Sequence, residues 1–256
     1  MAGILHFILL SKSDIVSGLE AAFESISCFR MGTTLNITFF FRNSKEYGVT
    51  LAPERRDDIL NSHQASTRCG TIVAVGDSLT AGFGVAEGEA YPALLERKLR
   101  DAGHDYRVIN AGVNGEKSGE VLGRLDAIIA KRPDIVILQT GTNDGLRGLS
   151  PLDMKRNIHE IVRALNEHGV TVLLAGMQNL KKRKGEYDEI VAAAYDEIAR
   201  AEGVILIPLF LAGVAGDPGL NRADGIHPTA EGYRTVVETV FPYVVEAIER
   251  RRRTPG

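Results

Sequence analysis

The chain has 256 residues, a formal net charge of −3 and 44% hydrophobic and 25% charged residues, a composition typical of a water-soluble globular protein. The small negative charge does not favour a nucleic-acid partner, and two cysteines are too few for a disulfide framework. The six histidines are scattered, and no apolar stretch is long enough to span a bilayer. We therefore expect neither a metal or other cofactor nor stable membrane insertion, while the oligomeric state stays open.

Residues 1–70 are expected to form an N-terminal extension without a motif. The apolar run 4–10 follows no basic segment, so no signal peptide is predicted. Residues 36–41 can form a strand, and 54–67 resemble a polar linker. Too little patterned apolar surface is present to offset the entropy of ordering, which predicts poor order. A start at Met31 and a small family-specific appendage remain open alternatives.

From residue 71 to 256 the chain alternates short β-branched runs with segments of helical periodicity, which predicts one domain. The helical segments repeat apolar residues at i, i+3, i+4 and i+7, and Ser150-Pro151 is typical of a helix start. The predicted strands are Ile72–Val75, Tyr106–Ile109, Asp134–Leu138, Val170–Leu174 and Val204–Ile207.

These strands lack polar alternation, which is typical of a parallel sheet covered on both faces. Right-handed crossovers then give a three-layer α/β/α sandwich with a flavodoxin-like, doubly wound parallel sheet of about five strands. Ligands bind such sheets beyond the carboxyl ends of the strands. The loops that follow the strands are therefore expected to share one rim.

Gly76-Asp77-Ser78-Leu79 follows the first strand of this sheet and places a serine hydroxyl at the rim. By itself this tetrapeptide is equally typical of a turn, in which Asp77 stabilises the backbone. Three later rim segments add glycine N–H groups, an amide and an Asp-x-x-His turn. They are Asn110–Glu116, Gly141–Gly145 and Asp224–Pro228.

Together these groups fit acyl transfer. Ser78 is a poor nucleophile until a base removes its proton, and His227 can be that base because histidine has an unperturbed pKa of about 6.5. Asp224 can fix the tautomer of His227 and stabilise the imidazolium. The N–H of Ser78, a glycine N–H of the second loop and the amide of Asn143 can stabilise the oxyanion.

In content and order, the four segments resemble the blocks of the SGNH (GDSL) hydrolases. Asn143–Gly148 is similar to the thioesterase I/protease I/lysophospholipase branch, often described as arylesterases. The resemblance covers about 71–248 and implies a hydrolase with Ser78 as nucleophile, an Asp224–His227 pair, and Gly115 rather than Gly112 beside Asn143 in the oxyanion hole. Relatives in this branch are often periplasmic or secreted, which leaves the compartment of this chain open.

The leading hypothesis is a serine esterase acting on carboxylic esters or thioesters, such as aryl esters, acyl-CoA or lysophospholipids. Leu79, Leu146 and Tyr187 are the candidate substrate-binding residues. The basic run 181–184 can attract anionic substrates or be a solvated loop. The alternatives are a carbohydrate or peptidoglycan O-acetyl esterase, which the absence of tryptophan does not favour, and a non-catalytic small-ligand binding module.

Overall fold

The structure is a computed structural model that describes residues 23–31, 34–41, 46–51, 69–177 and 186–253. The chain divides into two compact units, Met1–Thr67 and Arg68–Gly256. We describe each unit by itself.

The first unit contains a three-stranded antiparallel sheet in the order β1-β2-β3. Its strands are β1 (Phe23–Met31), β2 (Thr34–Phe41) and β3 (Glu46–Leu51). The strand expected at 36–41 lies within β2. The expectation that 1–70 is a poorly ordered extension stays a prediction.

The second unit is built on a five-stranded sheet in the order β5-β4-β6-β7-β8, in which all neighbouring strands run parallel. Each strand overlaps one of the predicted runs, so the predicted doubly wound parallel sheet is confirmed. The strands are β4 (Gly70–Gly76), β5 (Tyr106–Gly112), β6 (Ile135–Gln139), β7 (Thr171–Ala175) and β8 (Ile205–Ile207).

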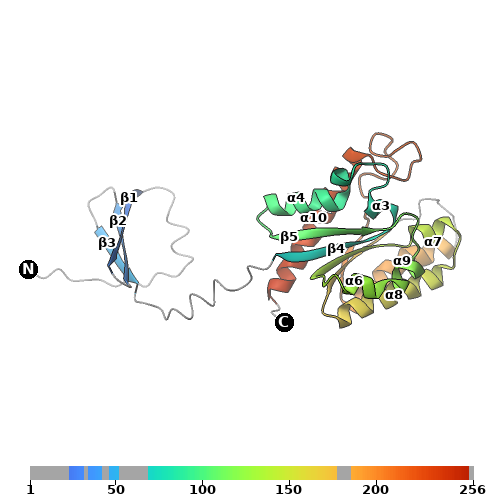
Figure 1. Cartoon of the computed structure of the whole chain (residues 1–256), viewed down its shortest axis with the longest axis horizontal. Helices are drawn as coiled ribbons and strands as arrows, with labels where there is room; N and C mark the ends of the chain where they lie inside the picture. The colour runs from blue at the N-terminus through green and yellow to red at the C-terminus, as the bar shows by residue number, and fades with distance from the viewer. Residues whose placement is uncertain (1–22, 32–33, 42–45, 52–68, 178–185, 254–256) are drawn as a thin grey trace, which may run out of the picture. The chain divides into compact units, whose positions relative to one another are not determined.

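Helices cover both faces of this sheet, which confirms the three-layer arrangement (Figure 1). Helices α4 and α10 pack together on one face, whereas α5, α8 and α9 pack on the other. The helices are α3 (Ser78–Ala81), α4 (Tyr91–Asp101), α5 (Ser118–Gly123), α6 (Leu125–Ile129), α7 (Thr142–Leu146), α8 (Pro151–Glu167), α9 (Glu186–Glu202) and α10 (Ala230–Arg253), with a short 3-10 turn at Glu87–Glu89.

Helix α8 illustrates how the sequence sets an element. The Ser150 side chain caps its first turn by accepting a hydrogen bond from the N–H of Asp153, and Pro151 occupies the first helical position. Its apolar stripe, which includes Ile158 and Leu165, is fully buried. Gly169, with φ of +70°, follows the end of the helix in the left-handed region that glycine tolerates.

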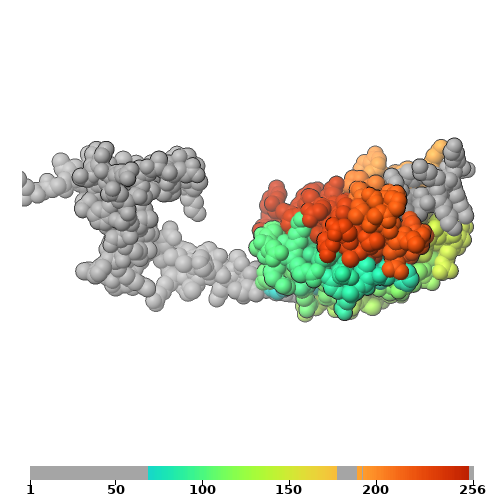
Figure 2. Space-filling model, turned by 90° about the horizontal axis from the view of Figure 1, so that it is seen from above, coloured from blue at the N-terminus to red at the C-terminus, as the bar shows by residue number. Residues whose placement is uncertain are grey.

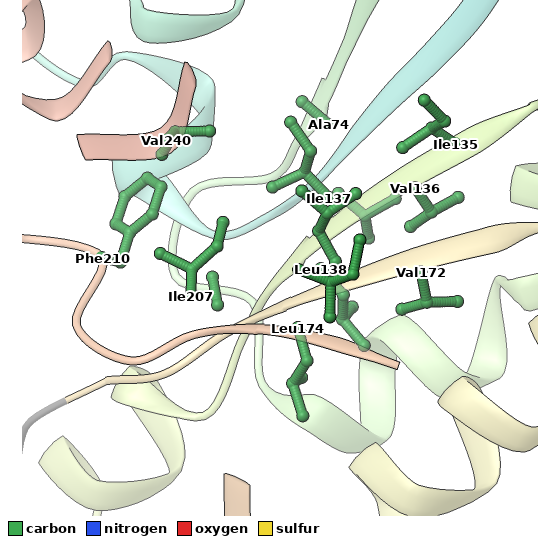
Figure 3. Close-up of a cluster of buried hydrophobic side chains, with 14 of the residues drawn as sticks. Ala74, Ile135, Val136, Ile137, Leu138, Val172, Leu174, Ile207, Phe210 and Val240 are labelled. Carbon is green, nitrogen blue, oxygen red and sulfur yellow. The ribbon is translucent and has the colours of Figure 1, made fainter. Parts of the chain in front are cut away.

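The core lies on both faces of the sheet. Figure 3 shows Ile207 near Phe210 and Val240 of the C-terminal region, and the side chains of β6 and β7 beside the other helical layer. In Figure 2 the orange-to-red residues of α10 lie beside the green residues near position 100, in accord with the contact between α10 and α4. Because the central strands β4, β6 and β7 are buried on both faces, the rim is where we expect a ligand to bind.

Gly112, at the end of β5, packs directly against the turn that carries Ser78. A Cβ atom there would lie 2.2 Å from the backbone nitrogen of Ala81, so no side-chain movement can relieve the clash. We expect Gly112→Ala to lower the free energy of unfolding by about 2–3 kcal/mol, measured by urea denaturation. Gly123→Ala is the matched control, because nothing lies within 4 Å of the added Cβ, and it should be neutral or stabilise by less than about 1 kcal/mol. Equal effects of the two substitutions would contradict this prediction.

Candidate active site

Ser78 occupies the first position of α3, directly after β4 ends at Gly76. Asp77 is the helix N-cap, and its Oδ1 accepts a hydrogen bond from the N–H of Leu79 at 2.9 Å. This turn places the partly exposed Ser78 at the rim of the sheet. The structural role expected for Asp77 in the turn matches this contact.

The structure brings Ser78, His227 and Asp224 together, although they are far apart in the sequence. The Oγ of Ser78 lies 2.9 Å from Nε2 of His227, and Nδ1 of the same ring lies 2.9 Å from Oδ2 of Asp224. With the ring proton on Nδ1, His227 donates to Asp224 and accepts from the Ser78 hydroxyl. This is the arrangement that a serine nucleophile requires.

Asp224 is held in its ionised form by its own turn. Its Oδ1 accepts hydrogen bonds from the N–H groups of His227 at 3.0 Å and Ile226 at 2.9 Å. These backbone donors, together with the His227 ring, lower the pKa of Asp224 to about 2. The carboxylate is therefore negative at any pH at which the imidazole titrates.

Two contacts fix the loop that carries His227. Arg222 joins two loops: its backbone N–H donates to the carbonyl of His227 at 2.8 Å, and its Nη1 donates to the carbonyl of Gly84 at 2.6 Å. The ring of Phe83 lies 4.7 Å from the imidazole ring, centroid to centroid. The 82–84 loop therefore positions the imidazole from one side.

A pocket of about 210 Å³ opens beside the Ser78 hydroxyl. Two of the predicted substrate-binding residues, Leu79 and Leu146, line it, whereas the side chain of the third, Tyr187 on α9, lies outside the described residues, as does the basic run 181–184. The lining residues are Ser78, Leu79, Phe83, Asn114, Gly115, Thr142, Asn143, Leu146, Ile226 and His227.

Gly115 and Asn143 also line this pocket, and they differ in whether their N–H donors already have protein acceptors. Among the described residues, no acceptor contacts the N–H of Ser78 or the N–H of Gly115. The Nδ2 atom of Asn143 donates to Oδ2 of Asp77 at 3.2 Å and to the carbonyl of Glu116 at 3.1 Å. Gly112 is absent from the lining, and its N–H donates to the Asn110 side chain at 3.0 Å.

Buried ion pairs and carboxylates support the loops around Gly115 and Asn143. Glu116, almost fully buried, accepts from Nε of Arg124 at 2.5 Å and from its Nη2 at 2.6 Å. Asp144 accepts from the N–H of Ser118 at 2.9 Å and from its hydroxyl at 2.6 Å. Both loops are thus anchored to α5.

Sequence reasoning missed several of these residues. Asn114, Thr142 and Ile226 line the pocket, and all three stand inside the motif segments, where adjacency to the motif residues is the only signal. His159 and His168 lie on or beside α8 and do not line the pocket: His159 contacts Glu202, and His168 contacts the carbonyl of Ala164.

No helix among the described residues combines the length and apolarity needed to cross a membrane. Within the same residues, no three His, Cys, Asp or Glu side chains are grouped so that they could hold a metal ion.

The chain is similar to known proteins over most of its second unit. Residues 74–235 match the model of the GDSL-like Lipase/Acylhydrolase family. The chain is 37% identical over 185 residues to Esterase TesA of Pseudomonas aeruginosa, an alignment that covers 72% of this chain and 91% of the relative. It is 32% identical to Thioesterase 1/protease 1/lysophospholipase L1 of Escherichia coli strain K12, over 63% of this chain and 76% of the relative.

The fold of this chain is also similar to that of a solved structure. A crystal structure of TesA superposes with a TM-score of 0.67 at 36% sequence identity, and the match covers 69% of this chain and 99% of that one. The matched share corresponds in size to the second unit, which carries every residue of the pocket.

Proposed function

This chain belongs to the GDSL-like lipase/acylhydrolase family and is a serine esterase, and we propose that residues 71–256 form its catalytic domain, with Ser78, His227 and Asp224 as the catalytic residues. One observation carries this assignment. The Ser78 hydroxyl, the His227 ring and the Asp224 carboxylate form a continuous chain of 2.9 Å contacts beside a pocket.

In the first half-reaction, the Oγ of Ser78 attacks the carbonyl carbon of the ester while Nε2 of His227 takes the hydroxyl proton. The tetrahedral intermediate collapses when His227 gives this proton to the leaving oxygen or sulfur, and the acyl group stays on Ser78. Water then repeats the sequence: it attacks the acyl-enzyme, His227 takes its proton, and Ser78 recovers that proton as the acid leaves. Asp224 stabilises the imidazolium in both steps.

The oxyanion is proposed to be stabilised by the N–H groups of Ser78 and Gly115 and by the amide of Asn143. The two backbone donors support this role because, within the described chain, nothing else accepts from them. Gly115 adopts a φ of +76°, a conformation that favours glycine, and so presents its N–H without a Cβ that would crowd the substrate.

The pocket supports esters or thioesters with an apolar acyl group. Leu79, Phe83, Leu146 and Ile226 provide apolar surface beside the nucleophile, and the relatives are named for esterase, thioesterase and lysophospholipase activities. We therefore propose aryl esters, acyl-CoA or lysophospholipids as the substrate range. A carbohydrate O-acetyl ester is the weaker candidate, because one stacking ring, Phe83, stands among the described lining residues.

Arg147 favours the substrates in this range that carry an anionic leaving group. Its exposed guanidinium lies beside Gly115, with Nη2 3.6 Å from the position that a Cβ of Gly115 would take. Among the described residues, no carboxylate forms an ion pair with it. A phosphate or carboxylate on the substrate could therefore pair with Arg147 without displacing a protein partner.

A fluorophosphonate probe tests the proposed function and separates an esterase from a non-catalytic binding module. We expect covalent labelling that mass spectrometry maps to Ser78, with a rate that falls on acidification. The sign follows from the chemistry: Nε2 can take the Ser78 proton only when it carries none, while Asp224, with its pKa of about 2, stays ionised. Labelling elsewhere, or a rate independent of pH, would contradict the assignment.

A further inference from the structure

Asp77 makes a contact that its role in the turn does not require. Its Oδ1 caps α3 through the N–H of Leu79, while its Oδ2 accepts from Nδ2 of Asn143 at 3.2 Å. The side chain is almost fully buried, and the N–H of Asp77 itself donates to Oε1 of Gln139 at 3.3 Å. One carboxylate thus joins the nucleophile turn to the loop that carries Asn143.

A cap alone does not explain a charged residue at this position. Asparagine and serine cap helices about as well as aspartate, and neither requires a buried charge. Burial raises the pKa of Asp77 to about 6, because the ionised form loses its hydration inside the protein. A residue that is not the most stabilising choice for its local structure is expected where that residue serves function.

The second oxygen of Asp77 has a consequence for the Asn143 amide. Nδ2 is held between two acceptors from different loops, Oδ2 of Asp77 and the carbonyl of Glu116. If the amide turned over, its oxygen would face both acceptors and would be repelled by them. The observed orientation, with Nδ2 toward both acceptors, is therefore enforced. Because Nδ2 has only two hydrogens, an oxyanion would receive one of them in place of the Glu116 carbonyl, while Asp77 keeps the other and holds the amide in position.

We propose that Asp77 is a positioning residue for the oxyanion hole, which acts by fixing the orientation of the Asn143 amide. This proposal rests on the proposed function, because it needs Asn143 to be an oxyanion donor. Asp77 makes no hydrogen bond to Ser78 Oγ or to the His227 ring, and its bond to Asn143 is the route by which we propose that it acts.

Two substitutions separate this role from capping. Asp77→Ser keeps a cap but leaves nothing at the position of Oδ2, and Asp77→Asn keeps a cap but turns an N–H₂ group toward the Asn143 amide when its oxygen caps the helix. We expect kcat for a p-nitrophenyl ester to fall about 10–100-fold in both, with KM changed less than about threefold, since a donor is misplaced but not removed. The melting temperature should change by only a few degrees.

Asp144→Asn is the matched control. Asp144 is also a buried carboxylate next to Asn143 in sequence, but its oxygens accept from Ser118 and make no contact with the Asn143 amide. We expect this variant to lose thermal stability while kcat stays within about threefold of wild type. If the loss of any buried charge near the site lowered kcat, Asp144→Asn and Asp77→Asn would instead lower kcat equally.

A double-mutant cycle with Asn143→Ala decides the matter. If Asp77 acts through Asn143, then Asp77→Ser should cost less than about threefold once Asn143 is already alanine. Losses that multiply across the two sites would overturn the proposal. A failure of the proposed function gives a different result. Ser78→Ala would then hydrolyse the ester as fast as wild type, and both the proposed function and the role of Asp77 would be rejected.

Discussion

Replacing Ser78 by alanine is expected to lower kcat/KM for a p-nitrophenyl ester by about 10⁴-fold or more. The substitution removes the only atom of the Ser78–His227–Asp224 chain that can form the acyl-enzyme, so neither half-reaction can follow the proposed route. Residual catalysis would come from the oxyanion donors and from substrate binding. Initial rates at substrate concentrations well below KM measure the loss.

Ser150→Ala is the control for this experiment. Ser150 caps α8 through the N–H of Asp153, away from the pocket, so its loss should cost about 1 kcal/mol of stability and leave kcat unchanged. Ser78→Ala should show the reverse pattern, because Ser78 is partly exposed and caps nothing. More than about 1% of wild-type activity in Ser78→Ala, in a preparation free of wild type, would reject Ser78 as the nucleophile.

The fold of the second unit was predictable because its signals are local. The central strands are short apolar runs, and burial on both faces explains why these runs lack polar alternation. Parallel strands joined by helices then have few permitted arrangements, since the crossovers are right-handed. The boundaries were less predictable: β5 continues three residues past Ile109 to Gly112, through Asn110, which the sequence assigns to a loop.

The candidate site was predictable to the extent that its residues belong to motif segments at the ends of strands. Topology alone places Ser78, Asn143 and His227 on one rim. The contacts between segments were not predictable, because they depend on side-chain geometry rather than on spacing. The bond from Asn143 to Asp77 and the ring contact between Phe83 and His227 each join loops that no local pattern relates.

His227→Ala is the second large effect that we expect, a loss of about 10⁴-fold or more in kcat/KM, because it removes the one base that contacts the Ser78 hydroxyl among the described residues. We expect part of this loss to be recoverable. Its side chain is 17% exposed and lines the open pocket, so truncation leaves a space that added imidazole can enter, between Phe83 and the Ser78 hydroxyl.

Rescue by imidazole distinguishes a missing base from a damaged fold. We expect millimolar imidazole to raise the rate of His227→Ala by about tenfold, with a dependence on pH that follows the neutral form of the added base. Ser78→Ala should gain nothing, since it lacks the nucleophile that the base would serve. If imidazole rescued both variants equally, it would be hydrolysing the ester directly. If it rescued neither, although both variants are folded by circular dichroism, the proton from Ser78 would have to go to a group other than His227.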